Sequence, residues 1–349
     1  MGRHPKDCSC KDCNLKNNIE KSEQPTNDNK AFDQLAKELE SKYNAKRASE
    51  IKIEPKIRIG LYPLDYVLDG GIAQCEGGHK IELFGRESSG KTTLALKIIA
   101  KYQELNKRCV FINAENSYDP EWAEINGVKN DNLLVVKPET MEAGGDLLIS
   151  LIAKVDLIVV DSIVAMIPIE ELEGGLEDKH MASQAKILAP MCRKINEAYK
   201  DYKTTIIFIN QIREKLGVMY GNPETTSGGR AIRHLYDSRI EVRAGQPLEM
   251  DIAEGEKKSK EKVGFEMNLK CVKNKKGRPH HQAIADFYDT GTFDNRKSLL
   301  FAGIKYGIIK FSGKTYEYGE IKAVGKDAFM ELLTDKILDK IEKDIWKTS

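Results

Sequence analysis

Residues 85–92 form a glycine-rich stretch that ends in a lysine and a threonine, Gly-Arg-Glu-Ser-Ser-Gly-Lys-Thr. This stretch follows an apolar run at 81–84 and precedes helix-like residues at 93–102. In that context the backbone N–H groups of the loop surround phosphates at the positive end of the helix, Lys91 reaches the β and γ phosphates, and Thr92 offers a hydroxyl to Mg²⁺. We therefore expect a site for ATP and Mg²⁺, made of Gly85, Arg86, Glu87, Ser88, Ser89, Gly90, Lys91, Thr92 and Thr93.

Hydrolysis of ATP needs an acidic residue near the metal and a group that orients water, and the sequence offers one candidate for each. Asp161 ends the apolar run at 157–161, so its carboxylate is expected at the carboxyl edge of a sheet, beside the phosphates and Mg²⁺. Glu115 follows the apolar run at 109–113 and is the candidate for the water-polarising base. The alternative for Asp161 is a turn residue that ends a strand, and for Glu115 an exposed loop residue.

Short apolar runs that alternate with helix-like segments predict the elements that position these residues. The runs lie at 80–84, 109–113, 133–136, 157–161 and 206–210. Such alternation is typical of a parallel sheet covered by helices on both faces. The sequence therefore predicts an α/β fold.

After Arg239 the pattern changes, because strand-like runs at 240–242, 266–272 and 283–287 follow one another without helices. These runs predict antiparallel strands that extend the sheet. The charged stretch at 253–262 is expected to be a solvated excursion. A helix at 298–306, a hairpin around 312–314 and a charged helix at the end predict a small C-terminal domain.

The N-terminal part has two different patterns. Residues 1–30 are polar and lack periodic apolar positions, which is typical of a flexible leader. Next, Phe32, Leu35, Leu39 and Tyr43 recur at spacings of three or four, so they form one apolar stripe on a helix. We expect four parts: the leader, a helix and linker at 31–55, a core at 56–292 and the small domain at 293–349.

Composition excludes several classes of protein. The chain has 349 residues, 55 Lys and Arg against 54 Asp and Glu, and a net charge of +1, so total charge gives no hint of a polyanionic partner. No apolar run is long enough to span a membrane, and the N-terminus lacks the apolar core of a signal peptide. Seven cysteines, an odd and small number, favour a reducing cytoplasm over a disulfide framework.

Four blocks of the sequence resemble those of bacterial RecA-type DNA recombinases. They are GRESSGKTTLAL at 85–96, FINAENSYDP at 111–120, LIVVDSIVAMIP at 157–168 and FINQIREKLGVMYGNPETTSGG at 208–229. The last block is long and specific, whereas a phosphate loop alone identifies only a superfamily. The resemblance covers about 31–345. It implies a RecA-like P-loop ATPase core with a mostly parallel twisted sheet, an N-terminal polymerisation helix and a small α+β C-terminal domain.

The resemblance assigns catalytic and nucleotide-binding roles. It matches Glu115 to the catalytic glutamate and Gln211 to a glutamine that senses the γ phosphate. Asp119 and Trp122 fall where the family contacts adenine, although Trp122 could also be a core residue. Lys273 and Lys275 match lysines that reach the ATP of the neighbouring subunit, although composition alone indicates a solvated basic face there.

The same resemblance implies two segments that bind DNA, from about 173 to 181 and from 212 to 226. Met181 and Leu216 match apolar side chains that wedge between bases, and Lys186, Arg193, Arg213, Gly228, Gly229 and Arg230 lie where the family holds phosphates. Arg243 and Lys270 match part of a second, weaker DNA site, but Ala244 replaces a neighbouring arginine of the family.

The implied activity is that of a DNA-dependent ATPase in recombination, repair and the SOS response. It would form a filament on single-stranded DNA, pair that strand with homologous duplex and promote strand exchange. The helix at 32–43 would pack on the next copy, which builds an open helical polymer. The alternative is an ATP-gated filament that coats single-stranded DNA without exchange, and a hexameric helicase is disfavoured. Loader proteins are not indicated by the sequence.

Three positions and the C-terminal end depart from the family pattern or from helix chemistry. Asn113 stands where the family has an aspartate, which removes a charge near Glu115. His234 replaces an aromatic residue at the subunit interface, and Pro190 is expected to kink or break a helix after the first DNA segment. The chain also ends without the acidic tail of well-known members.

Cysteines fall into two groups. His4, Cys8, Cys10 and Cys13 form a compact cluster in the leader that offers four ligands to Zn²⁺, and a reduced flexible leader is the alternative. The other four cysteines are predicted to be structural. Cys109 and Cys271, within expected strands, are predicted to be buried.

Overall fold

The computed structural model describes residues 29–51, 54–174, 183–214, 224–254 and 257–348. The chain divides into two compact units, Met1–Ile53 and Glu54–Ser349. The predicted zinc ligands His4, Cys8, Cys10 and Cys13, and the predicted wedge residues Met181 and Leu216, lie outside the described residues. A finer division of the second unit at residue 293 stays a prediction.

The described part of the first unit is the helix α2 (Asn29–Tyr43) followed by a short 3₁₀ turn, η1 (Ala48–Glu50). The helix ends before Asn44, whose positive φ of 53° belongs to the left-handed region that asparagine tolerates. The apolar stripe is exposed: Phe32 by 59%, Leu35 by 48%, Leu39 by 37% and Tyr43 by 66%. The predicted helix is thus confirmed. Its apolar face is largely exposed, and the Arg47 guanidinium lies over the Phe32 ring, 5.5 Å from its centroid.

The predicted parallel strands are all present in the second unit. They are β1 (His79–Gly85), β2 (Cys109–Asn113), β3 (Leu133–Val136), β4 (Leu157–Asp161) and β5 (Thr205–Glu214). Their order across the sheet is β1-β5-β4-β2-β3, and each neighbouring pair is parallel. This order brings the carboxyl ends of β1, β2, β4 and β5 to one edge, where the predicted catalytic residues begin.

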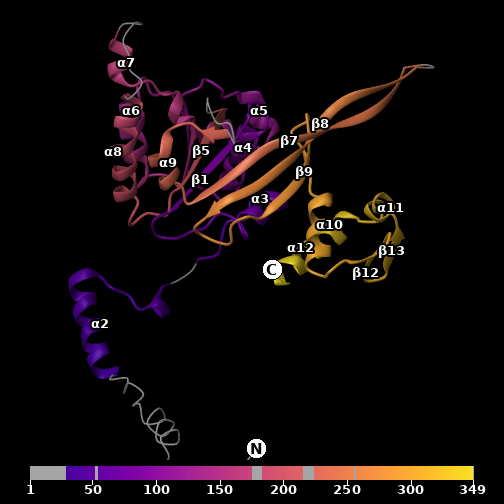
Figure 1. Cartoon of the computed structure of the whole chain (residues 1–349), viewed down its shortest axis with the longest axis horizontal. Coiled ribbons are helices and arrows are strands. Elements are labelled where there is room, and N and C mark those ends of the chain that lie inside the picture. The colour runs from indigo at the N-terminus through magenta and orange to yellow at the C-terminus, as the bar shows by residue number, and fades with distance from the viewer. Residues whose placement is uncertain (1–28, 52–53, 175–182, 215–223, 255–256, 349) are drawn as a thin grey trace, which may run out of the picture. The chain divides into compact units, whose positions relative to one another are not determined.

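Antiparallel strands extend the sheet on the other side of β1, as predicted. These are β7 (Ser238–Glu254), β8 (Lys257–Asn274), β9 (Gln282–Tyr288) and β10 (Phe293–Asp294), in the order β10-β9-β8-β7-β1, while β6 (Glu224–Thr226) pairs with β5. Pairing between β8 and β9 ends at Gly264, and beyond it β7 and β8 continue as a two-stranded ribbon (Figure 1).

The charged stretch at 253–262 belongs to the far end of this ribbon. Its residues 259–262 are exposed, so the prediction of a solvated excursion holds for them. Regular pairing up to Glu254 and Lys257 was not predicted, because the alternating charges of this stretch hide its strand character.

Helices cover both faces of the sheet (Figure 1). On one face α3 (Tyr62–Val67), α4 (Lys91–Glu104) and α5 (Pro120–Ile125) pack on alternate strand residues such as Phe111 and Val159. On the other, α6 (Met141–Leu151), α8 (Ser183–Ala198) and α9 (Gly229–Leu235) pack on the intervening residues, such as Ile112 and Val160. Strand side chains alternate between the two cores because successive residues point to opposite faces.

Pro190 lies inside α8, and the helix continues past it to Ala198. Of the predicted kink or break, a break is therefore wrong. Leu188, Met191, Cys192 and Ile195 are buried in the core shared with α6, so packing on both sides of Pro190 holds the helix together across the missing hydrogen bond.

The C-terminal elements follow β10. They are α10 (Arg296–Lys305), β11 (Lys310–Ser312), β12 (Thr315–Tyr318), β13 (Ile321–Val324), α11 (Lys326–Glu331) and α12 (Asp335–Thr348), and β11, β12 and β13 form a small antiparallel sheet. The remaining short elements are η2 (Asn130–Asn132), η3 (Ile163–Ala165) and α7 (Ile169–Glu173). Phe329, Ile341 and Ile345 join the core cluster that contains residues of α4, which anchors this region to the sheet.

Two further predictions concern cysteines and membranes. Cys109 and Cys271 are buried, at 3% and 0% exposure, as predicted, and Cys192 is buried as well. Among the described residues no helix is long and apolar enough to cross a membrane.

Candidate functional site

The glycine-rich loop joins β1 to α4, as the sequence predicts. Gly90 precedes the helix with a φ of +89°, and a Cβ there would lie 2.2 Å from the Met267 Cε atom. The Nζ atom of Lys91 donates a hydrogen bond of 2.6 Å to the Arg86 carbonyl across the loop. The Ser89 hydroxyl is buried, and no other described residue is its hydrogen-bond partner. A closed loop of this shape with an unsatisfied hydroxyl and a lysine fits a bound polyphosphate.

The predicted metal ligands meet beside this loop. The Thr92 hydroxyl donates to Asp161 Oδ2 at 3.2 Å, so the first turn of α4 and the end of β4 are in direct contact. Burial raises the pKa of the Asp161 carboxyl, the charge of Glu115 adds to this, and bonds from Ser117 and Thr92 oppose it. Two oxygen ligands at the phosphate loop suit Mg²⁺, whose charge would favour ionised Asp161.

Glu115 lies on the loop after β2, one strand away from Asp161. The backbone N–H groups of Ala114 and Glu115 donate to the Asp161 carbonyl at 2.8 and 3.0 Å, which fixes the start of this loop. The Glu115 Oε1 atom accepts a hydrogen bond of 2.6 Å from Ser162, and its Oε2 atom accepts one of 3.3 Å from the Gln211 amide. Glu115 and Gln211, predicted from separate blocks, are therefore direct neighbours.

Sequence reasoning missed two hydroxyl groups of this site. Ser162, which directly follows β4, donates to Glu115, and Ser117 donates to Asp161 Oδ2 at 2.7 Å. Ser162 follows β4, which ends in Asp161, and Ser117 lies on the loop after β2, two residues beyond Glu115. This position after a strand was the signal in the sequence that could have identified them. Their effect is to orient the two carboxylates.

Asn113 forms the turn that carries Glu115. Its side-chain oxygen accepts hydrogen bonds from the backbone N–H groups of Ser117 and Tyr118, at 2.9 and 3.4 Å. An amide oxygen performs this task without a charge. Asn113 therefore stabilises the turn of the loop after β2, which carries Glu115.

The two predicted adenine contacts lie at the start of α5. Asp119 caps the helix, since its Oδ1 atom accepts from the N–H groups of Glu121 and Trp122 at 3.0 and 3.1 Å. The Trp122 indole is half-buried, donates to Thr93 at 3.3 Å and meets Phe287 edge to face. Trp122 thus packs against the core and also borders the helix of the phosphate loop.

Lys273 and Lys275 contact α9 instead of the phosphate loop of their own chain. Lys273 donates to the carbonyls of Arg233, at 2.8 Å, and Tyr236, and Lys275 donates to that of His234 at 3.4 Å. Cations at a helix C-terminus satisfy its last carbonyls. Within the described residues, the structure does not bring these lysines to the Glu115 site.

The predicted phosphate contacts beside the two DNA segments lie on α8, on β5 and at the start of α9. Lys186 and Arg193 on α8 are exposed, and so are Arg213 on β5 and Arg230 on α9. Gly228 and Gly229 begin α9 with positive φ values of 90° and 74°. Two left-handed residues in succession need glycine, and they turn the chain from β6 into the helix.

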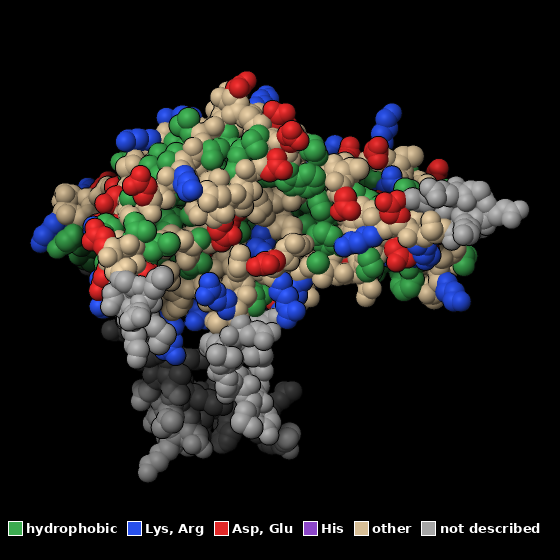
Figure 2. Space-filling view, turned by 90° about the horizontal axis from the view of Figure 1, so that it is seen from above, with side chains coloured by type: hydrophobic (Ala, Val, Ile, Leu, Met, Phe, Trp, Pro, Cys, Tyr) green, Lys and Arg blue, Asp and Glu red, His purple; other side chains and the backbone are tan. Residues whose placement is uncertain are grey.

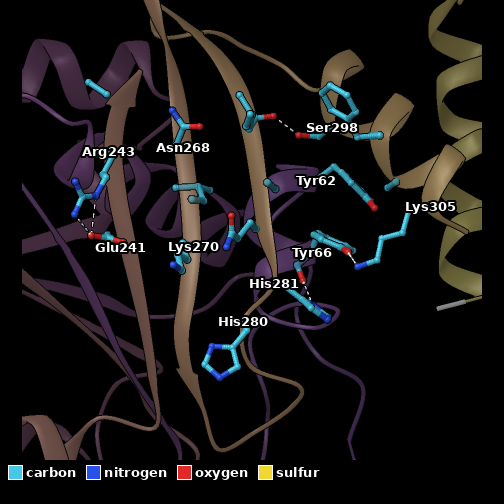
Figure 3. A pocket seen from close by; sticks show the side chains of 17 residues that line it. Tyr62, Tyr66, Glu241, Arg243, Asn268, Lys270, His280, His281, Ser298 and Lys305 are labelled. Carbon is cyan, nitrogen blue, oxygen red and sulfur yellow. Dashed lines mark hydrogen bonds and ion pairs between the residues drawn. The ribbon is translucent and has the colours of Figure 1, made fainter. Parts of the chain in front are cut away.

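Arg243 and Lys270 line one cavity, of about 930 Å³, between the antiparallel strands and α10 (Figure 3). Glu241 holds the Arg243 guanidinium through a hydrogen bond of 2.7 Å, and Lys305 on the opposite wall donates to the Tyr66 hydroxyl at 2.7 Å. The two predicted residues of the second DNA site are thus brought together.

Charge is distributed evenly on the view shown in Figure 2, where acidic and basic side chains are interspersed. The exposed cations on α8, β5 and α9 stay the predicted contacts of a polyanion.

Comparison with known proteins gives consistent results. The family model for the RecA N-terminal domain matches residues 30–292. Protein RecA of Thermus thermophilus is 35% identical over 332 residues, which cover 92% of this chain and 94% of that protein. Protein RecA of Thermus aquaticus is 36% identical, with 91% and 94% covered, and Protein RecA of Acidothermus cellulolyticus is 38% identical, with 83% and 82% covered.

Proposed function

Because this chain belongs to the RecA family, we propose that it is an ATP-dependent recombinase that polymerises on single-stranded DNA and exchanges strands with homologous duplex. Family membership supports the coarser role in DNA recombination and repair, with ATP and Mg²⁺ as cofactors. Filament formation, strand exchange and the residue roles below are our proposal.

One observation carries the ATPase proposal. Thr92, Asp161, Glu115 and Gln211 come from four different structural segments, and direct hydrogen bonds join them in two pairs. We assign Thr92 and Asp161 to Mg²⁺ and Lys91 to the phosphates, where a bound metal would neutralise developing charge. Glu115 would orient the attacking water, held in place by Ser162 and Gln211.

Two features support assembly into a polymer. The stripe of Phe32, Leu35, Leu39 and Tyr43 on α2 is exposed, and burying such a stripe on a second copy would be favourable. Lys273 and Lys275 lie at α9, away from the phosphate loop of their own chain. Lysines in this place would complete the site of an adjacent copy, so that hydrolysis depends on the filament.

The ATPase proposal is tested by replacing two lysines of α4 separately, Lys91 and Lys101. We expect Lys91→Ala to abolish hydrolysis stimulated by single-stranded DNA and ATP-dependent DNA binding. Lys101→Ala, on the same helix but paired at the surface with Glu104, is the matched control and should behave like the wild type. Retained ATP-dependent binding at wild-type affinity in Lys91→Ala would refute the assigned role.

Strand exchange is tested by joint-molecule formation between single-stranded DNA and a homologous supercoiled duplex. Electron microscopy of the same samples with a slowly hydrolysed ATP analogue should show helical filaments. Filaments without joint molecules would refute exchange and favour the coating alternative. Closed rings would contradict the polymer itself.

A further inference from the structure

Glu82 is a carboxylate in the middle of β1, three residues before the phosphate loop, and its side chain is fully buried. A charge in such a position requires close partners. Its Oε1 atom accepts a hydrogen bond of 2.8 Å from the Asn210 amide, and its Oε2 atom accepts one from Arg239 Nε. Burial raises the pKa of Glu82, and the Arg239 charge opposes this. We call Glu82, Asn210, Arg239 and Thr226 the Glu82 cluster.

One side of the cluster reaches the catalytic centre. Asn210 is 1% exposed, and its side-chain oxygen accepts a hydrogen bond of 2.9 Å from the backbone N–H of Gln211. Gln211 in turn donates its amide to Glu115. Glu82 therefore fixes the Asn210 side chain, and Asn210 fixes the backbone of Gln211 opposite Glu115.

The other side of the cluster reaches the chain that returns from the second predicted DNA segment. Arg239 Nη2 donates to the Thr226 hydroxyl at 3.0 Å, and the Asn210 amide donates to the Ser227 carbonyl at 3.2 Å. The Arg239 guanidinium also stacks on the Phe84 ring, 4.7 Å from its centroid. Residues 226–227, which lead directly into Gly228 and α9, are thus tied to the same carboxylate.

We propose that Arg239, oriented by Glu82, is a positioning residue that keeps residues 226–227 in register with Gln211, so that DNA and nucleotide act on one rigid scaffold. The planar guanidinium is suited to this task because separate nitrogens bond Glu82 and Thr226 at once. The inference rests on the proposed DNA-dependent ATPase activity. It goes further in naming the contact through which the DNA segment is held to the nucleotide site.

The test removes a single hydroxyl from the cluster. Thr226→Val keeps the shape of a buried side chain and deletes the acceptor for Arg239. Thr315→Val, the same change at a half-buried threonine of β12, is the matched control, because this strand lies outside both predicted DNA segments and the nucleotide site. Thr226→Ser keeps the hydroxyl and should restore the behaviour of the wild type.

ATP hydrolysis is measured against the concentration of oligo(dT), and urea unfolding is measured on the same samples. For Thr226→Val we expect the half-saturating DNA concentration to rise about tenfold, because the variant loses one charge-assisted hydrogen bond. The KM for ATP should match that of Thr315→Val, and the urea midpoint should fall only by what the loss of one hydrogen bond costs. Arg239→Lys, which keeps the charge but has one terminal nitrogen, should shift DNA dependence in the same direction.

Equal DNA dependence in Thr226→Val and the wild type would overturn the inference. So would a shift that Thr226→Ser does not reverse, or a loss of stability to urea much larger than one hydrogen bond costs, since either indicates a general structural defect. A wild-type protein whose hydrolysis does not respond to DNA would instead overturn the proposed function itself. The response of wild-type ATP hydrolysis to DNA therefore tells whether the proposed function fails or only this inference.

Discussion

His79 is a buried histidine that makes the stability of this protein depend on pH. It lies at the start of β1 with no exposed surface. Its Nδ1 atom accepts a hydrogen bond of 3.1 Å from the Ala73 N–H, and Nε2 lies 2.7 Å from the Ser238 hydroxyl. A proton added at Nδ1 would face another donor. Burial, more than any neighbouring charge, lowers the pKa of His79 to about 3.

The size of the effect follows from this difference in pKa. The unfolded chain takes up a proton at His79 near pH 6.5, whereas the folded chain stays neutral until about pH 3. Between these values the unfolded state binds more protons, so stability is lost as the pH falls. The expected contribution of His79 is about 0.8 kcal/mol of lost unfolding free energy at pH 6 and about 2 kcal/mol at pH 5, relative to pH 8.

His79→Asn removes this titration and keeps an acceptor for Ala73. We expect the free energy of unfolding to fall by about 1–3 kcal/mol at every pH, because the packing changes and the Ser238 contact is lost. We also expect it to depend less on pH than in the wild type. Urea unfolding at pH 8, 7, 6 and 5, followed by circular dichroism, measures both. His280→Asn is the control, since His280 is exposed and asparagine tolerates its φ of 69°. Parallel curves for His79→Asn and wild type from pH 8 to 5 would refute the assigned neutral state.

Three other predictions follow from single contacts. Gly90→Ala should weaken ATP binding about tenfold in a nucleotide titration, because a Cβ strains the left-handed backbone, with its φ of 89°, that joins the phosphate loop to α4; unchanged affinity would contradict this. Ser162→Ala should lower kcat about tenfold with the KM for ATP unchanged, since Glu115 loses a hydrogen bond; a change confined to KM would contradict the positioning role. Ile341→Ala, in a fully buried position of α12, should cost about 2–4 kcal/mol in urea unfolding, and a loss below about 0.5 kcal/mol would show that α12 is not anchored to the core.

Much of the fold was predictable because its signals are local. Apolar runs indicated β1, β2, β3 and β4 to within one residue, whereas β5 continues to Glu214, beyond the predicted end at 210. The phosphate loop was found by its glycines and its lysine. Asp161 and Glu115 could be chosen because they follow such runs, and parallel strands bring their ends to one edge. The helix does not break at Pro190, because tertiary packing on both sides of the proline outweighs its local effect.

What only the tertiary structure decided is which side chains meet. Ser162 lies 47 residues from Glu115 along the chain, and Arg239 lies 157 residues from Glu82. Their pairing depends on strand order and register, which set the neighbours of every strand residue, and no local pattern carries that information. The sequence alone thus determined the strands, the phosphate loop and the apolar stripe of α2. The hydrogen bonds that orient the catalytic residues exist only once β1, β5, β4 and β7 are assembled in one sheet.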